Sequence, residues 1–209
     1  MRLPDRLLLI TDRHTARQPL EVVLLAALEA GCRWILVREK DLDPTARRKL
    51  IARVLALAAP FGATVSISYD ATLPLIPADT GLHLPGGVPV AQIRERYPTR
   101  LLGVSTHTLR EASAAYAGGA DYLTFGPVFA SLSKPGYLPR EGLAGLQAIA
   151  ARLPIPVVAL GGITPDNARA CLAAGAQAVA VVGTVMQAGD PGRVVRELLA
   201  VTHGQRERS

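Results

Sequence analysis

The chain has 209 residues, 49% of them hydrophobic and only 4% aromatic, which predicts a large core built from Ala, Leu, Val and Ile. No apolar run is long enough to cross a membrane and the N-terminus lacks the features of a signal peptide, so we expect a cytoplasmic protein with no membrane partner. The net charge is +6, but the basic residues are not interleaved with aromatic residues that could stack on bases. We therefore expect anionic small molecules rather than nucleic acid as partners.

Eight apolar runs of strand length follow one another along the chain. Several are continuous rather than alternating, as in strands buried on both faces of a parallel sheet. The runs cover residues 7–11, 34–38, 64–68, 81–84, 101–105, 122–126, 157–161 and 178–183. Segments with helical periodicity separate them, most clearly at 20–30, 46–59, 108–117, 143–152, 165–174 and 191–201, and more weakly at 71–76 and 90–97. This alternation predicts an α/β fold, a single-domain (β/α)8 TIM barrel over residues 1–203, with a disordered tail at 204–209.

Two local patterns bear on how the helices end and face. A glycine follows three predicted helices, at Gly31, Gly119 and Gly175, and fits the left-handed residue that ends a helix. The basic run Arg47-Arg48-Lys49 lies on the helix predicted at 46–59, and we interpret it as a solvated helix face.

Functional residues of such barrels lie at the C-terminal ends of the strands. Arg38 and Lys40 follow the second strand and favour an oxyanion, such as phosphate, over a solvated charge cluster. Asp70 follows the third strand, where it either binds a metal or, as we favour, caps the next helix.

Two histidines lie at strand ends further along the chain. His83 lies inside the strand at 81–84, where a lone histidine is more often a core residue than a catalyst. His107 follows the fifth strand, and either transfers protons or helps to cap the helix that starts at Thr108. Ser105, at the end of the same strand, can point into the mouth of the barrel.

The last strand ends give the strongest local signal. Gly161-Gly162 and Val182-Gly183 lie where backbone N–H groups can approach an anion closely, and they predict a phosphate site, although a tight turn explains Gly-Gly alone. The longest loop, 130–142, carries Ser131, Ser133 and Lys134, which suit either a grip on a diphosphate or an ordinary surface loop.

Taken together, these strand ends resemble the thiamine phosphate synthase and TenI family over nearly the whole chain. The matching pieces are Arg38-Glu39-Lys40, Gly81-Leu82-His83, residues 103–108, Ala120-Asp121-Tyr122, Gly126-Pro127-Val128-Phe129, Lys134, Gly161-Gly162-Ile163-Thr164 and Gly175-Ala176. The synthase of this family joins a pyrimidine pyrophosphate to a thiazole phosphate with the help of Mg²⁺. The resemblance implies that pyrophosphate is held by Arg38, Lys40, Ser105 and Lys134, near the loop hydroxyls of Ser131 and Ser133. It implies that the thiazole phosphate is held by backbone N–H groups of Gly162, Val182 and Gly183.

The chain departs from the synthase pattern where the metal is expected. Leu36 replaces a Gln, Ser68-Tyr69 replaces an Asn-Asp pair, and Val88 stands in place of a further Asp. Mg²⁺ prefers carboxylate ligands, and Asp70 is one residue out of register. We therefore assign no metal ligand, and Asp70 is the remaining candidate.

The altered loop at His83-Leu84-Pro85 is similar to the TenI-type thiazole tautomerase branch, which moves a proton on a thiazole carboxylate phosphate and needs no cofactor. The catalytic His of that branch is replaced by Pro127, which leaves His107, His83 or the loop around Lys134 for proton transfer.

Three hypotheses follow. The leading one is a TenI-type protein of thiamine biosynthesis that binds thiazole phosphate and acts as a thiazole tautomerase. The second is a thiamine phosphate synthase with Mg²⁺ and a pyrimidine pyrophosphate as additional partners. The third is a non-catalytic regulatory protein that binds thiazole phosphate. The sequence leaves the oligomeric state open, and a homodimer is plausible on general grounds.

Overall fold

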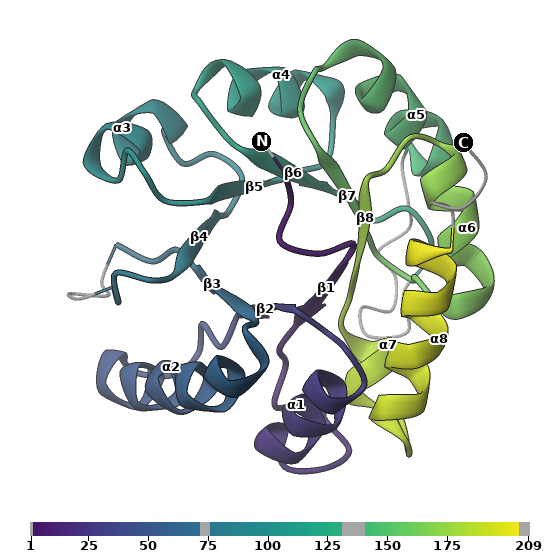
Figure 1. Cartoon of the computed structure of the whole chain (residues 1–209). Helices are drawn as coiled ribbons and strands as arrows, with labels where there is room; N and C mark the ends of the chain where they lie inside the picture. The colour runs from purple at the N-terminus through teal and green to yellow at the C-terminus, as the bar shows by residue number, and fades with distance from the viewer. Residues whose placement is uncertain (1, 72–75, 131–140, 205–209) are drawn as a thin grey trace.

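Eight short parallel strands close into a barrel in chain order in the computed structural model, which describes residues 2–71, 76–130 and 141–204 (Figure 1). The strands are β1 (Leu7–Ile10), β2 (Trp34–Val37), β3 (Thr64–Ser68), β4 (Gly81–Leu84), β5 (Leu102–Thr106), β6 (Tyr122–Phe125), β7 (Val157–Leu160) and β8 (Ala178–Val181). All eight predicted strands are present within one or two residues of their predicted bounds, and the fold is the predicted single-domain (β/α)8 barrel.

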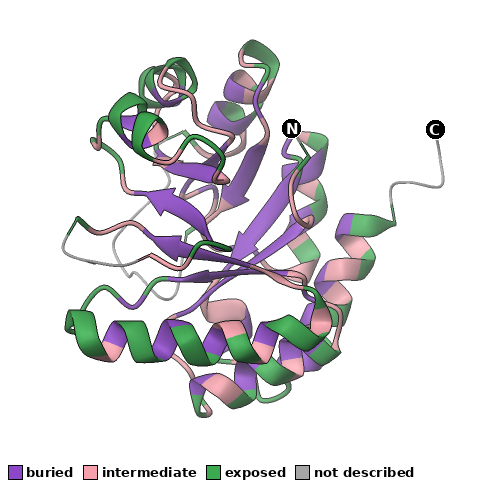
Figure 2. Ribbon diagram, turned by 60° about the vertical axis from the view of Figure 1, so that its left-hand side comes forward, coloured by how far each residue is buried: buried purple, intermediate pink, exposed green. Residues whose placement is uncertain are grey.

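Helices surround the barrel (Figure 1), and each of the long ones carries buried residues alternating with exposed ones (Figure 2). They are α1 (Leu20–Glu29), α2 (Pro44–Ala58), α3 (Val90–Arg96), α4 (Leu109–Ala117), α5 (Gly142–Arg152), α6 (Pro165–Ala173), α7 (Gly183–Met186) and α8 (Pro191–His203), with a 3₁₀ turn η1 (Ala59–Phe61) after α2. Helix α7 is absent from the predicted elements because four residues are too few to produce a periodic pattern. Most of the helix expected at 71–76 lies outside the described residues, as does residue 205 onward of the predicted tail.

The predicted glycine joints are confirmed by their backbone angles. Gly31, Gly119 and Gly175 have φ values of +107°, +89° and +99°, the left-handed region that side chains with a Cβ rarely adopt. Each follows a helix and leads within three residues into the next strand. No helix in the described part of the chain is long and apolar enough to span a membrane.

The basic run on α2 is not the fully solvated face that its sequence indicates. Arg47 is only 1% exposed, whereas Arg48 and Lys49 are exposed. The Arg47 guanidinium donates to the Ser68 carbonyl oxygen at the end of β3, and its Nη1 lies 3.2 Å from Asp70 Oδ2. Arg47 is buried because it shares the inner face of α2 with Leu50 and Val54, three and seven residues later.

The inside of the barrel is filled by side chains and is not a pore. A second apolar cluster, distinct from the layer between strands and helices, consists of Leu8, Ile10, Trp34, Leu36, Tyr122, Val158, Ala178 and Ala180. The rings of Trp34 and Tyr122 meet edge to face with centroids 4.9 Å apart. A ligand must therefore bind at an end of the barrel, as is usual for this architecture.

Candidate active site

A cavity of about 620 Å³ lies at the C-terminal ends of the strands. Nine of the side chains and backbone segments singled out in the sequence line it together: Arg38, Lys40, His83, Ser105, His107, Gly161, Gly162, Val182 and Gly183. Asp70 is not among the described residues that line the cavity. The expected roles of Ser131, Ser133 and Lys134 fall outside the described residues.

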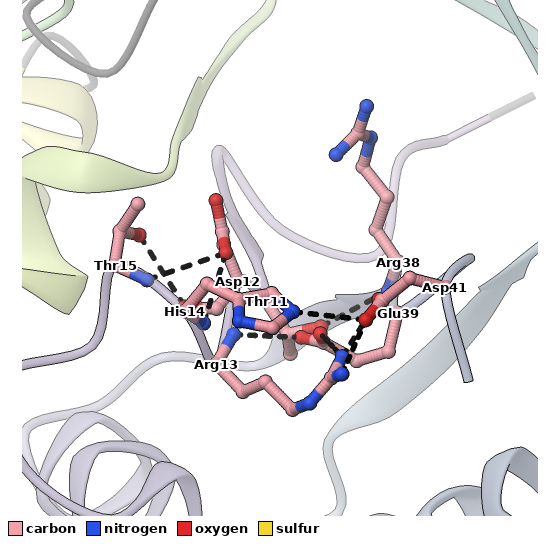
Figure 3. Close-up of polar contacts among 8 residues, drawn as sticks. All are labelled: Thr11, Asp12, Arg13, His14, Thr15, Arg38, Glu39 and Asp41. Atoms are coloured by element: carbon pink, nitrogen blue, oxygen red, sulfur yellow. Dashed lines mark hydrogen bonds and ion pairs between the residues drawn. The ribbon is translucent and has the colours of Figure 1, made fainter.

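The two cations after β2 are presented to the cavity by an alternation of side chains. Arg38 and Lys40 are exposed and line the cavity, while Glu39 between them is only 2% exposed. The Arg38 backbone N–H donates to Thr11 Oγ1 at 3.0 Å, which fixes the start of the loop against the end of β1. In Figure 3 the Arg38 side chain extends away from the polar cluster that surrounds Glu39.

Arg13 joins the loop after β1 to the loop after β2 (Figure 3). Its backbone N–H donates to Glu39 Oε1 at 3.0 Å and its Nη1 to Glu39 Oε2 at 2.9 Å. The same guanidinium donates to both carboxylate oxygens of Asp41, the Nη1 bond being 2.7 Å. His14 Nε2 lies 2.8 Å from Asp41 Oδ2. We call Arg13, Glu39 and Asp41 the clamp.

The charges within the clamp reinforce one another. The Arg13 guanidinium, and after it the His14 ring, hold the pKa of the Asp41 carboxyl well below its usual range. Asp41, more than Glu39, raises the pKa of Arg13. Arg13 and Asp41 are therefore both ionised across the physiological pH range, and this pair does not act as a pH switch.

His83 in β4 is buried, lines the cavity and contacts three hydroxyl groups. Its Nε2 lies 2.9 Å from Ser105 Oγ and 3.3 Å from Thr124 Oγ1, and its Nδ1 lies 3.1 Å from the Tyr122 hydroxyl oxygen. Burial, and then the charges of Lys40 and Arg38, lower the pKa of His83 to about 3. The imidazole is therefore neutral at pH 7 and cannot act as a charged acid there.

His107 also lines the cavity but is fixed differently. Its ring Nδ1 donates to the Gly126 carbonyl oxygen, which leaves Nε2 as the ring's remaining polar atom. Thr108 is the N-cap of α4, since its hydroxyl oxygen accepts the Glu111 N–H at 3.2 Å. His107 also takes part in the start of α4, because its backbone N–H donates to Glu111 Oε2 at 2.6 Å. A part of its ring in proton transfer stays a prediction.

The glycine turn after β7 is held in place by its neighbours. Gly161 and Gly162 have φ values of +103° and +61°. A Cβ on Gly162 would lie 2.3 Å from the Ala130 carbonyl oxygen, so conformation and space both require glycine there. Asn167 Nδ2 donates to the Gly162 carbonyl oxygen at 2.8 Å and Thr184 Oγ1 to that of Ile163 at 2.5 Å. These two bonds orient the turn toward the cavity.

The described residues do not fit a Mg²⁺ site. Within residues 2–71, 76–130 and 141–204, no three His, Cys, Asp or Glu side chains are grouped so that they could hold a metal. Asp70 pairs with the buried cation Arg47, and Glu39 and Asp41 are engaged by Arg13. Asp12 is the one carboxylate among the described cavity-lining residues, and its Oδ1 accepts the backbone N–H of His14 at 3.1 Å. Asp12 alone cannot form a Mg²⁺ site built from protein ligands, and a cation there would take most of its oxygen ligands from substrate phosphates and water.

Comparison with known proteins agrees with this arrangement of strand ends. The family model described as thiamine monophosphate synthase matches residues 7–185, which is most of the barrel. The chain belongs to the thiamine monophosphate synthase family. The names of the relatives below connect this family with thiamine biosynthesis.

Two relatives and one solved structure illustrate how far the similarity extends. A putative thiamine-phosphate synthase of Geobacter sulfurreducens is 40% identical over 198 residues, covering 93% of each chain. The thiamine-phosphate synthase of Anaeromyxobacter dehalogenans is 44% identical over 168 residues, covering 79% of this chain and 75% of that one. The structure of thiamine phosphate pyrophosphorylase from Pyrococcus furiosus superposes with a TM-score of 0.86 at 31% identity, covering 95% and 96% of the two chains. These names favour the synthase hypothesis over the tautomerase hypothesis that the altered loop indicates.

Several residues of this site were given no functional role from the sequence. Thr11, Asp12 and Arg13 follow the first strand, so the same strand-end rule would have found them. Tyr122 lies at the opposite end of its strand from the cavity, and only its contact with His83 gives it a place near the site.

Proposed function

We propose that this member of the family is a thiamine-phosphate synthase, which joins a pyrimidine pyrophosphate to a thiazole phosphate and releases pyrophosphate. The observation that carries the proposal is that two sets of groups suited to anions border one cavity. Arg38 and Lys40 form one set after β2, and the glycine turns after β7 and β8 form the other. A synthase needs two such sets, because both of its substrates are phosphorylated. A tautomerase has one phosphorylated substrate and needs one.

The reaction depends most on the cationic set, Arg38 and Lys40. The electron pair of the thiazole nitrogen forms a new C–N bond to the pyrimidine's methylene carbon, and the C–O bond to pyrophosphate breaks with its electron pair leaving on oxygen. Negative charge grows on the departing group, and cations already in place stabilise it. Arg38 and Lys40 are assigned to this task. Arg38 offers a planar fork of donors and Lys40 a compact charge.

The glycine set is assigned to the second substrate. Backbone N–H groups of Gly162, Val182 and Gly183 would hold the thiazole phosphate and so direct the thiazole ring toward the pyrimidine. Holding two reactants in a productive orientation is itself a large contribution to the rate. Apolar side chains of Leu160 and Ile163, which line the cavity beside the turn, suit the flat face of the thiazole ring.

The resemblance implies Mg²⁺ for the synthase, but the described side chains do not fit it, so no step here depends on a metal. The tautomerase hypothesis rests on the loop at residues 83–85, and the named relatives give it no support. His83 is neutral and buried, which leaves His107 as the histidine at the cavity that could move a proton.

The test is direct formation of thiamine phosphate. Purified protein is incubated with both substrates and Mg²⁺, and the product is followed by fluorescence after oxidation. We expect turnover, and we expect Arg38→Ala and Lys40→Ala each to lower kcat/KM by about 10²-fold. Arg53→Ala is the matched control, because Arg53 is an exposed cation that pairs with Glu21 on the outside of the barrel.

Absence of turnover beside an active relative would contradict the proposal. Conversion of the thiazole carboxylate phosphate tautomer, lost in His107→Ala, would then identify a tautomerase, and binding of thiazole phosphate without conversion would identify the regulatory protein. A parallel reaction with chelator tests the Mg²⁺ requirement.

A further inference from the structure

A chain of hydrogen-bonding side chains crosses the filled interior of the barrel and ends at the cavity. Trp34 Nε1 donates to Ser66 Oγ at 3.1 Å. Burial raises the pKa of Tyr122, and the Ser66 hydroxyl, acting as a donor toward the phenol oxygen, opposes that rise. The Tyr122 hydroxyl lies 3.1 Å from His83 Nδ1, and His83 Nε2 lies 2.9 Å from Ser105 Oγ. Four of the five side chains are buried, and Ser105 is partly exposed where it lines the cavity. We call this set the relay.

The first member of the relay determines the direction of the others. An indole N–H can only donate, so the Ser66 oxygen accepts from Trp34 and its own hydrogen is directed at Tyr122. The Tyr122 hydrogen then goes to His83 Nδ1, which accepts it. Since a neutral imidazole carries one hydrogen, that hydrogen is on Nε2 and is donated to Ser105 Oγ. The opposite direction would leave the Ser66 hydrogen without an acceptor among these side chains, a costly arrangement for a buried group.

This direction of hydrogen bonding requires a neutral His83 imidazole, and the surroundings of the ring favour the neutral form. The ring is buried, and the charges that act on it, those of Lys40 and Arg38, are positive. Burial and this repulsion both oppose a second proton. A doubly protonated ring would donate at both nitrogens and reverse the Tyr122 bond.

Two strand glycines leave the space that the relay occupies. A Cβ on Gly103 of β5 would lie 2.0 Å from Tyr122 Cζ, and a Cβ on Gly81 of β4 would lie 2.7 Å from Ser66 Oγ. Glycine inside a strand weakens it and is expected where another group approaches closely. Both glycines have such a neighbour, and in each case it is a member of the relay.

We propose that the relay orients the Ser105 hydroxyl so that its hydrogen points into the cavity and is donated to a phosphate or diphosphate oxygen of the ligand. The Ser105 oxygen already accepts from His83, so its hydrogen is left for an acceptor on the open side. Arg38 and Lys40 line the same cavity, and they select an anionic acceptor. Ser105 is the binding residue, and His83 and Tyr122 are positioning residues. Naming the ligand as a diphosphate rests on the proposed function.

A double-mutant cycle with inorganic pyrophosphate as the probe tests the relay. Binding to the whole protein is measured by calorimetry for wild type, Ser105→Ala, Tyr122→Phe and the double variant. We expect Ser105→Ala to weaken binding about tenfold, because a hydrogen bond to a charged group is lost. Tyr122→Phe should weaken binding several-fold. Without the Tyr122 donor, the His83 hydrogen can move to Nδ1, and Nε2 then accepts the Ser105 hydrogen that the ligand would otherwise receive. The double variant should bind no more weakly than Ser105→Ala alone.

Tyr116→Phe is the matched control, because Tyr116 is 42% exposed on α4 and neither belongs to the relay nor lines the cavity. The relay would be overturned if the losses in the double variant multiplied, or if folded Tyr122→Phe bound pyrophosphate as wild type does. Absence of pyrophosphate binding by wild type would overturn it as well. If Tyr122→Phe does not fold, Trp34→Phe takes its place, since it removes the donor that sets the direction. Coupled losses in a protein that makes no thiamine phosphate would leave the relay in place and overturn only the proposed synthase activity.

Discussion

The imidazole of His83 carries a thermodynamic signature that can be measured without any substrate. Its pKa is lowered to about 3 in the folded chain, whereas an unfolded chain holds a histidine near its ordinary value of 6.5. Between these two values the unfolded state binds a proton that the folded state does not. The contribution of His83 to the free energy of unfolding therefore rises with pH across this window. The same contribution is lost as the pH falls from 6.5 toward 3.

This linkage predicts a difference between wild type and His83→Gln. From pH 6 to pH 4 wild type should lose roughly 2 kcal/mol more of its free energy of unfolding than the variant, at about 1.4 kcal/mol for each pH unit fully inside the window. Urea unfolding at pH 7, 6, 5 and 4 measures both curves. Because every other titrating group is common to the two proteins, parallel curves would mean that His83 is not held neutral by the fold.

At the scale of elements, the clamp fixes two neighbouring strand ends against each other. Arg13 follows β1, and Glu39 and Asp41 follow β2, so the loop that carries Arg38 and Lys40 cannot move independently of the loop before it. Glu39 is a buried carboxylate whose described partner is Arg13. Removing Arg13 would leave that charge buried and unpaired, and the loop would have to open to hydrate it.

We therefore predict that Arg13→Ala raises the KM for the pyrimidine pyrophosphate about tenfold, with less than a twofold change in the KM for the thiazole phosphate. Arg13→Lys should recover part of the loss, because it restores the charge but not the two-pronged geometry. Steady-state kinetics with each substrate varied in turn gives both constants. Equal increases in the two KM values would indicate a general loss of structure instead.

The elements could be predicted from the sequence because each depends on a local pattern. Buried parallel strands appear as continuous apolar runs, and the residues that end helices appear as glycines. The clamp and the relay have no local pattern. Arg13 and Glu39 are 26 residues apart, and His83 and Tyr122 are 39 apart. Arg47 shows the same limit, because a basic triplet looks solvated until the carbonyl oxygen of Ser68 is known to lie beside it.

At the scale of the whole molecule, the two ends of the barrel have different tasks. Opposite the cavity, Asp121 just before β6 accepts the Leu102 N–H at 2.7 Å and Arg94 Nη2 at 2.6 Å. Arg94 also donates to the carbonyl oxygens of Gly119 and Arg100. These bonds join α3 to the starts of β5 and β6 and involve no cavity-lining residue.

Asp121→Ala should therefore lower stability and leave ligand affinity unchanged. We expect a loss of about 1.5–3 kcal/mol, since two donors including a charged one lose their acceptor. The midpoint of thermal unfolding should fall by roughly 2–4 °C for each kcal/mol in a chain of this size. Calorimetry gives the midpoint, and pyrophosphate binding at a temperature well below it gives the affinity. Weaker binding by the folded variant would show that the two ends are coupled.

The filled interior also gives the molecule its own optical reporter. Trp34 is the only tryptophan in the chain, it is fully buried, and its ring meets that of Tyr122. Its emission therefore comes from a single dry position at the start of the relay, several side chains below the cavity. Loss of the barrel would move that emission toward longer wavelengths as water reaches the indole. A ligand that reorders the hydroxyl groups above it would alter the intensity without opening the fold, so one unlabelled chromophore can distinguish unfolding from occupancy.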